Sequence, residues 1–374
     1  MAHYRLRPLR AVLVVATVAL AIVVWQRAGR PPASPQATRR HTAGAPRQHR
    51  APPAHRYRGL VGSRTPFAGA IYIADEAGNR IIKVNAQKQV LWTAHVPLPD
   101  DANPMPGGGP IIVNSDANQV VYAVSPTTGK ILWTYGHTGH SGSGPGYLYI
   151  PEDSYGMPGH RVLITDPGNE RAIMVSMLTG QLLWQYGHTG VESTKPGYLY
   201  WTNNAVPLYG GNVLITDGAA PGKPQQVLEV NPAGQIVWHV VLPAVITYPS
   251  DAMPVGPGLY ALADYAKPAG LYVINQQGHI VWSYLVQSGP GALNHASSIN
   301  RLPNGNFLVS DDQNDRVVVI DPALHRIVWQ YGTTGVSGSG PDQLVGNTDS
   351  KAVGEPLPPY VPWEGYQGPL PKAK

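Results

Sequence analysis

Cysteine is absent from the 374-residue sequence, so a disulfide framework, a thiolate zinc site and a cysteine nucleophile are all excluded. Charged residues are scarce at 13%, whereas glycine (42) and proline (38) are abundant beside many short apolar runs. This combination is typical of a turn-rich all-β protein. The sequence also lacks a nucleophile elbow, a phosphate-binding loop, an HExxH motif and a Rossmann fingerprint.

Acidic residues are missing from the first 64 positions, which hold 12 of the 27 Lys and Arg residues. The rest of the chain therefore carries 15 basic against 22 acidic residues, a net charge of −7. The folded part is acidic although the whole chain is basic. Because nucleic-acid binding needs a basic face on the folded domain, we expect no nucleic-acid partner.

The N-terminus resembles a targeting segment. Residues 1–10 form a basic cytoplasmic flank, and the apolar run 11–25, "AVLVVATVALAIVVW", is long for a signal-peptide core but short for a full span. We interpret it as an uncleaved signal anchor, with a cleaved signal peptide as the alternative. Residues 26–64, rich in Pro, Arg and Ala, predict a disordered tether. The folded domain would then lie outside the cytoplasm, held at the cell membrane by a single pass or secreted after cleavage.

A tryptophan in an "apolar-apolar-Trp" context recurs six times after residue 65, usually behind a turn such as "PTTGKILW" or "NPAGQIVW". Its spacings of 41, 51, 54, 44 and 47 residues match the length of a four-stranded propeller blade. We therefore predict a six-bladed β-propeller over residues 65–360. We assign a structural role to the six residues Trp92, Trp133, Trp184, Trp238, Trp282 and Trp329.

Each Trp would lie on the outermost strand d of a blade, with strands b and c before it and the innermost strand a of the next blade after it. The first blade then lacks a strand a. The segment "LVGNTDSKAVGEP" at 344–356 can supply that strand, so we expect a C-terminal inner strand to close the ring, with residues 361–374 as a tail.

The repeats resemble the pyrroloquinoline-quinone-like and NHL-like propeller superfamily of bacterial secreted and membrane-anchored proteins. "VVYAVSPTTGKILW" (120–133) is similar to the first repeat type and "LPNGNFLVSDDQNDRVVVID" (302–321) to the second. The resemblance implies a propeller architecture. Quinone-binding members generally have eight blades and, in some cases, a vicinal cysteine pair. We expect no quinone cofactor in this chain, because it has six repeats and no cysteine.

A longer motif stands at three of the crossovers from strand d to the next strand a. It reads "WTYGHTGHSGSGPGYLYIPED" at 133–153 and returns at 184–204 and 329–349. Its glycines allow tight turns, and a catalytic loop is normally needed only once, so the repetition favours a structural role. His137 and His140 have a workable metal spacing but no third ligand nearby, so we assign no metal to them.

Aspartates also recur at the end of strand b, where we interpret them as turn residues that accept backbone hydrogen bonds. These residues are Asp75, Asp166, Asp217, Asp264 and Asp311.

One polar residue recurs near each inner strand, and we expect the six to surround the mouth of the central channel. They are Asp101, Asp153, Asn204, Asp251, His295 and Asp349. We favour a structural role, in which each side chain bonds neighbouring backbone N–H groups and locks the blades, and ligand binding is the alternative. Calcium remains an alternative ligand because it takes several oxygen donors. No other cofactor is expected.

Two functions from different classes fit these features. The favoured one is a monomeric, membrane-anchored propeller that binds or organises a protein, peptide or glycan of the envelope. The alternative is an enzyme resembling propeller arylsulfotransferases or lyases, with His295 as base or nucleophile. A sulfate or phosphate donor would meet up to four carboxylates there and no matching Arg, which weighs against the enzyme.

Overall fold

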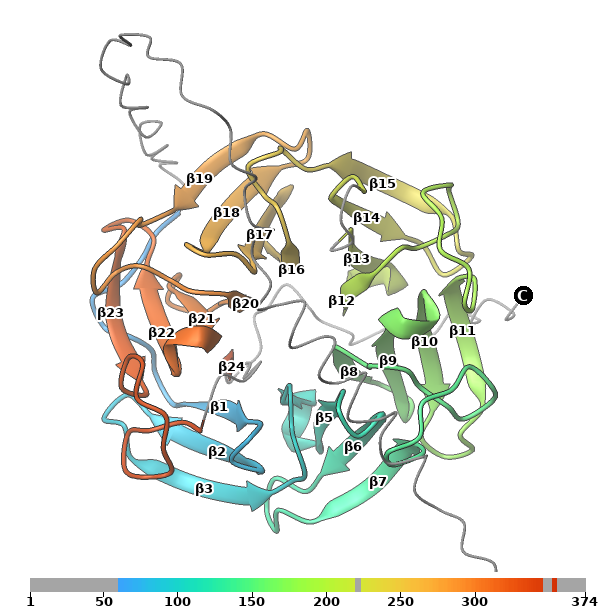
Figure 1. The fold of residues 1–374 in the computed structure, drawn as a ribbon, viewed down its shortest axis with the longest axis horizontal. Helices are drawn as coiled ribbons and strands as arrows, with labels where there is room; N and C mark the ends of the chain where they lie inside the picture. The colour runs from blue at the N-terminus through green and yellow to red at the C-terminus, as the bar shows by residue number, and fades with distance from the viewer. Residues whose placement is uncertain (1–59, 219–222, 346–351, 355–374) are drawn as a thin grey trace, which may run out of the picture. The chain divides into compact units, whose positions relative to one another are not determined.

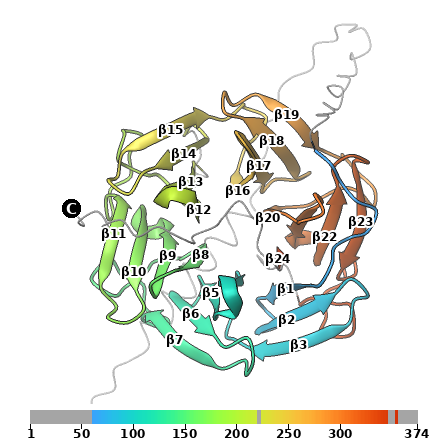
Figure 2. The ribbon, with the colours of Figure 1, turned by 180° about the vertical axis from the view of Figure 1, so that it is seen from behind.

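The computed structural model describes residues 60–218, 223–345 and 352–354. These residues form six four-stranded antiparallel sheets arranged as the blades of a propeller, seen from opposite sides in Figure 1 and Figure 2. The predicted all-β, six-bladed fold is confirmed. The described helices are single 3₁₀ turns: η1 (Pro106–Gly108), η2 (Pro167–Asn169), η3 (Tyr209–Gly211) and η4 (Asp312–Asn314).

Blades 1 to 3 follow the predicted order, with strand a innermost and strand d outermost. Blade 1 contains β24 (Ala352–Gly354), β1 (Ala70–Asp75), β2 (Arg80–Asn85) and β3 (Val90–His95). Blade 2 contains β4 (Asn103–Pro104), β5 (Ile111–Ser115), β6 (Val120–Val124) and β7 (Ile131–Gly136). Blade 3 contains β8 (Ser154–Met157), β9 (Arg161–Asp166), β10 (Arg171–Ser176) and β11 (Leu182–Gly187).

Blades 4 to 6 repeat the same order. Blade 4 contains β12 (Thr202–Pro207), β13 (Val213–Asp217), β14 (Gln226–Val230) and β15 (Ile236–Val241). Blade 5 contains β16 (Pro249–Gly256), β17 (Leu259–Asp264), β18 (Gly270–Asn275) and β19 (Ile280–Tyr284). Blade 6 contains β20 (Ala296–Arg301), β21 (Phe307–Asp311), β22 (Arg316–Asp321) and β23 (Arg326–Tyr331).

The hydrophobic core lies between the blades. Strands such as β5 and β6 are buried along their whole length, because both faces of each sheet pack against a neighbouring blade. Each of the six buried clusters accordingly combines side chains from two adjacent blades. Burial of these apolar side chains is the main favourable contribution to the assembly of the ring.

The repeated tryptophans contribute to the same interfaces. The indole N–H donates to a carbonyl oxygen in the c–d turn of the next blade, at 2.9 Å, for three of them: Trp238 to Gln276, Trp282 to Pro322 and Trp329 to Ala86. The last of these bonds joins blade 6 to blade 1. The predicted structural role is therefore visible directly at these three positions.

Every outer strand carries a β-bulge at the residue just before its Trp. In blade 1, Lys83 pairs with Trp92 and Val84 pairs with Val90, so Leu91 has no partner. The equivalent bulges lie at Leu132, Leu183, Val237, Val281 and Val328. Because a bulge interrupts the regular edge, it disfavours edge-to-edge pairing with another sheet.

The ring closes as predicted. Strand β24 pairs antiparallel with β1, with Ile71 opposite Gly354 and Ile73 opposite Ala352. The N-terminal boundary differs from the predicted one, because Leu60 is buried and Ser63 exchanges hydrogen bonds with Asn306 of blade 6. Residues 60–64, assigned to the tether, therefore belong to the propeller.

Several predicted features lie outside the described residues: the basic flank 1–10, the apolar run 11–25, the tether up to residue 59, Asp349 and the tail 361–374. Among the residues that the structure describes, no helix is long and apolar enough to span a membrane.

The aspartate at the end of strand b clamps the incoming crossover to the blade. Its carboxylate accepts a hydrogen bond from a crossover N–H in five blades, at 2.6 to 3.0 Å. The donor–acceptor pairs are Val345–Asp75, Tyr149–Asp166, Tyr200–Asp217, Tyr248–Asp264 and Asn294–Asp311. The prediction that these aspartates accept backbone hydrogen bonds is confirmed.

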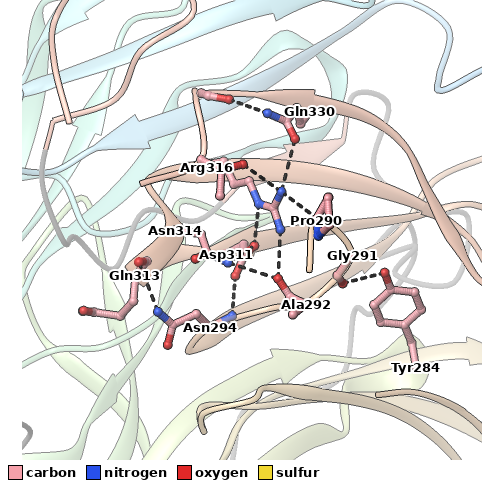
Figure 3. A network of polar contacts seen from close by, with 12 residues as sticks. Tyr284, Pro290, Gly291, Ala292, Asn294, Asp311, Gln313, Asn314, Arg316 and Gln330 are labelled. Carbon is pink, nitrogen blue, oxygen red and sulfur yellow. Dashed lines mark hydrogen bonds and ion pairs between the residues drawn. The ribbon is translucent and has the colours of Figure 1, made fainter. Parts of the chain in front are cut away.

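An arginine completes this clamp in three blades. Figure 3 shows the example of blade 6, where Arg316 Nε lies 2.7 Å from Asp311 Oδ2. The same guanidinium donates to the crossover carbonyls of Ala292 and Pro290 at 3.0 and 3.2 Å. The equivalent ion pairs are Arg80–Asp75 and Arg171–Asp166. In each pair, the aspartate accepts a hydrogen bond from an N–H group of the crossover and the arginine donates to at least one of its carbonyl groups.

Ring closure predicts that two C-terminal truncations will differ sharply. Removing residues after 345 takes away β24 and leaves β1 with an unpaired edge. We expect cooperative unfolding in denaturant to be lost in this variant and retained when only residues 361–374 are removed. Equal tolerance of both truncations would contradict closure by the C-terminal strand.

The clamps predict different costs for the same substitution in two blades. Asp166→Asn leaves the buried Arg171 without its carboxylate and should lower the free energy of unfolding by about 3 kcal/mol or more. In blade 4, Gln226 donates to Asp217 in place of an Arg, so Asp217→Asn should cost about 1 kcal/mol at most. Urea unfolding measures both values, and equal costs would refute the clamp.

Asp217 also predicts a pH dependence. Burial raises the pKa of this carboxyl to about 6 from its ordinary value of 3.8. A raised pKa in the folded state favours the protonated form, so this contribution to stability is present below pH 4 and is lost as the pH rises through about 6. Asp217→Asn should remove this step from the stability profile. A step that persists unchanged in the variant would assign it to another group.

Candidate functional site

The three long crossovers share one backbone arrangement on the face that also carries the b–c turns, hereafter the crossover face. A glycine N–H of each crossover donates to an Asn carbonyl of the adjacent b–c turn at 2.9 Å. The pairs are Gly139–Asn118, Gly190–Asn169 and Gly335–Asn314. This repeated contact supports the structural interpretation of the motif.

A second glycine explains why each crossover can approach the blade so closely. Gly136 has a φ of +104°, and a Cβ at this position would lie 2.3 Å from the carbonyl oxygen of Gln119. Gly187 and Gly332 meet the same constraint in the other two crossovers, with φ of +87° and +93°. Only glycine tolerates both the positive φ and the close contact.

Two of the three crossovers carry a feature that the sequence interpretation missed. His137 stacks on Tyr147 and His188 stacks on Tyr198, each with ring centroids 4.0 Å apart and an interplanar angle of 25°. Both histidines are exposed, and the two loops belong to neighbouring blades. Within the described residues, no group of His, Cys, Asp or Glu is arranged to hold a metal ion.

The third crossover keeps the backbone but lacks this pair. Thr333 stands where the histidines stand, and the Gln343 side chain accepts a hydrogen bond from Gly340 in place of the tyrosine ring. Because the Gly335–Asn314 contact persists, the loop forms without a His–Tyr stack. The stack is therefore an addition to the structural motif rather than a requirement of it.

The strand registers bring four of the six predicted ring residues to equivalent positions. Asn204 lies opposite Thr216 and Asp251 lies opposite Ala263, in each case one residue before the aspartate that ends strand b. Asp101 and Asp153 occupy the same position just ahead of β4 and β8. Asp349 lies outside the described residues.

His295 is a correction to the predicted ring. In blade 6 the equivalent position belongs to Ser298, which lies opposite Ser310, and His295 stands three residues earlier. Its imidazole Nδ1 lies 2.8 Å from Asn294 Oδ1, and its ring packs edge-on against Tyr265 at 4.8 Å. The sequence contains a signal for the correct register, because Asp153, Asn204, Asp251 and Ser298 each precede the strand b aspartate by 13 residues.

The ring side chains make hydrogen bonds between blades. Asp153 accepts a bond from the Asn103 amide of blade 2 at 3.2 Å and another from the Asn204 amide of blade 4. Asp251 of blade 5 accepts a bond from the N–H of Ile299 in blade 6 at 2.9 Å. The geometry therefore supports the blade-locking interpretation over an open ligand ring.

The same residues create a negatively charged environment around Tyr155 on β8. Burial raises the pKa of the Tyr155 phenol well above its usual value, and the carboxylates of Asp153, Asp251 and Asp101 raise it further. Its hydroxyl points to Met253 Sδ at 3.9 Å. An anionic ligand would be repelled here, whereas a cationic group would be attracted.

A further repeated geometry lies three residues before the ring position, at what we call the hinge residue. Four of the five described crossovers have a positive φ there, at Leu98 (42°), Ile150 (55°), Trp201 (98°) and His295 (58°). A positive φ is strained for residues with bulky side chains. The sequence did not predict these positions, because their residue types do not indicate a positive φ.

The hydrogen bonds of the ring predict how two Asp→Asn substitutions and the addition of Ca²⁺ will affect stability. If the carboxylates lock the blades, Asp153→Asn and Asp251→Asn should each lower the free energy of unfolding by about 1 to 3 kcal/mol. Thermal unfolding with and without millimolar Ca²⁺ should then give the same Tm for the wild type. A calcium-dependent rise in Tm that disappears in both variants would instead support the calcium alternative.

Comparisons with known proteins agree with this architecture. A family model described as outer membrane protein assembly factor BamB matches residues 23–196, a little under half of the chain. No curated protein matches the chain significantly. The solved structures that match include a protein of unknown function from Bacteroides caccae, with 18% identity, a TM-score of 0.52, and coverage of 70% of this chain and 92% of that one.

A second structural match is titled as a nidogen/laminin complex, with 14% identity, a TM-score of 0.52, and coverage of 70% of this chain and 92% of that one. At these identities the two structures show the fold alone. The repeat type is indicated by the family match over residues 23–196 and by the six blades of four antiparallel strands. Residues 23–196 are thus similar to the PQQ-like propeller family, and the described residues have the six-bladed propeller fold.

Proposed function

We propose that this protein is a binding or scaffold module that holds an envelope protein on its crossover face. The observation that carries the proposal is the pair of His–Tyr stacks, His137–Tyr147 and His188–Tyr198, on two adjacent crossovers. The third crossover forms without such a stack, so the fold alone does not explain them.

The composition of the first of these loops is that of a recognition surface. The first loop, residues 134–150, consists mostly of Gly, Ser, His, Thr and Tyr and contains no acidic or strongly basic side chain. Tyrosine offers a large, rigid contact area at low entropic cost, and Ser and Gly offer adaptable hydrogen bonding. The contacts to Asn118 and Asn169 preorganise both loops, which reduces the entropy lost on binding.

The family match supports a scaffold function, because the model carries the name of an assembly factor. We extend to this chain only the general class, a propeller that organises another envelope protein. Anchoring through residues 11–25 and a location outside the cytoplasm are part of the same proposal. The enzymatic alternative required His295 in the ring, and because the register puts His295 at a hinge, we do not propose it.

Site-specific photocrosslinking in intact cells tests this proposal. A photoreactive residue in place of Ser141, which leaves both His–Tyr stacks intact, should form an adduct with one discrete envelope protein. The matched control is Ala233, which lies in a c–d turn on the opposite face and should give no such adduct.

A second set of variants separates the stacks from the loops that carry them. His137→Thr with Tyr147→Gln, and His188→Thr with Tyr198→Gln, copy the third crossover and should keep Tm within a few degrees of the wild type. The adduct formed from a photoreactive residue at Ser141 should nevertheless be lost. Adducts that persist in these variants, or equal adducts from both faces, would contradict the proposal.

A further inference from the structure

The N–H group of the hinge residue is held by a repeated contact from the b–c turn. In three crossovers the acceptor is the side chain of the residue that ends this turn. The acceptor–donor pairs are Asn79–Leu98 at 3.1 Å, Gln119–Ile150 at 2.7 Å and Glu170–Trp201 at 2.9 Å. All three acceptors are themselves in the left-handed conformation, with φ between 52° and 62°.

Only one of these three acceptors can change its charge. Asn79 and Gln119 are amides, whereas Glu170 is a carboxylic acid at the same structural position. Asp315 ends the equivalent turn of blade 6, but the hinge position that it would face lies outside the described residues. Of the three contacts that the structure describes, the one at Trp201 is therefore the one whose strength can depend on pH.

The charged groups around Glu170 offset its negative charge only in part. Glu192 on the crossover and Asp217 at the end of β13 are both acidic. Lys223 is the nearby cation, but its Nζ lies 2.7 Å from Glu192 Oε1. Arg171, the next residue in the chain, forms an ion pair with Asp166 instead of with Glu170. Burial raises the pKa of Glu170 to about 7.

We propose that Glu170 is a pH-dependent latch: its protonated carboxyl holds the hinge residue Trp201 and the crossover 188–201 closed, and its ionisation releases them. The carbonyl oxygen of the protonated acid still accepts the Trp201 N–H bond. The Trp201 bond by itself favours the ionised carboxylate, but burial outweighs it. Ionisation leaves a half-buried charge beside two other carboxylates, and opening lets that charge reach water.

The direction of the pH effect follows from the pKa in the two states. In the open crossover the pKa of Glu170 would be near its ordinary value of 4.5, and in the closed one it is about 7. Because the closed form has the higher pKa, its advantage is complete below pH 4.5 and is lost as the pH rises through about 7. The strain at Trp201, with a φ of 98°, also favours release.

This latch would control one half of the proposed binding surface. His188 and Tyr198 lie on the crossover that Glu170 holds, whereas His137 and Tyr147 lie on the crossover held by Gln119. Raising the pH would loosen the first stack and leave the second in place. The latch itself is a property of the chain alone and can be tested whether or not a partner is found.

Amide hydrogen exchange of the full-length protein between pH 5 and pH 8 tests the latch, with rates corrected for intrinsic exchange. The Ile150 amide serves as the internal reference, because Gln119 does not titrate. In the wild type we expect the protection of Trp201 relative to Ile150 to fall by at least about tenfold over this range.

Two reciprocal variants make the test specific. Glu170→Gln should abolish the pH dependence at Trp201, and Gln119→Glu should create one at Ile150. A wild-type ratio that stays constant, or a pH dependence at Trp201 that survives in Glu170→Gln, would overturn the proposal. If Glu170→Gln is unstable, the wild-type ratio decides, since a ratio that stays constant from pH 5 to pH 8 would overturn the proposal.

Discussion

The rest of this propeller depends on one repeated contact, a hydrogen bond from the backbone of the incoming crossover to a buried carboxylate. The aspartate that ends strand b, such as Asp311, accepts an N–H bond from the chain that arrives from the previous blade. In three blades an arginine binds the carbonyls of the same segment, so the crossover is held through donors and acceptors together. Because charged hydrogen bonds are stronger than neutral ones, one pair can fix a loop of about twenty residues.

The polar groups of the inner strands serve a related purpose. Asp153 joins blades 2, 3 and 4, and Asp251 joins blades 5 and 6, so carboxylates that could have formed a ligand site are used between blades. The repeated structure thus accounts for most of the chemically notable side chains. What it leaves unexplained are features present in some blades only: two His–Tyr stacks and one ionisable latch. Function is best sought in these departures from the repeat.

The fold was predictable because its signals are periodic. The Trp spacing indicates the blade, and the missing first strand a predicts closure by the C-terminal segment, which β24 confirms. The ring was only partly predictable, because choosing the most polar residue near each inner strand selected His295, whereas the 13-residue interval to Asp311 selects Ser298. The positive φ of Ile150 and Trp201 could not be predicted from their residue types, because tertiary contacts impose a conformation that these residues disfavour.

The central claim is that the carboxylate and the guanidinium of the clamp act as one unit. A double-mutant cycle on Asp311→Asn and Arg316→Gln, measured by urea unfolding, tests it most directly. Each single change should lower the free energy of unfolding by about 3 kcal/mol or more, because each leaves a buried charge unpaired. The double variant should lose clearly less than the sum of the two, with a coupling of at least about 1 kcal/mol. Additive losses would show that the two side chains act independently and would contradict the clamp.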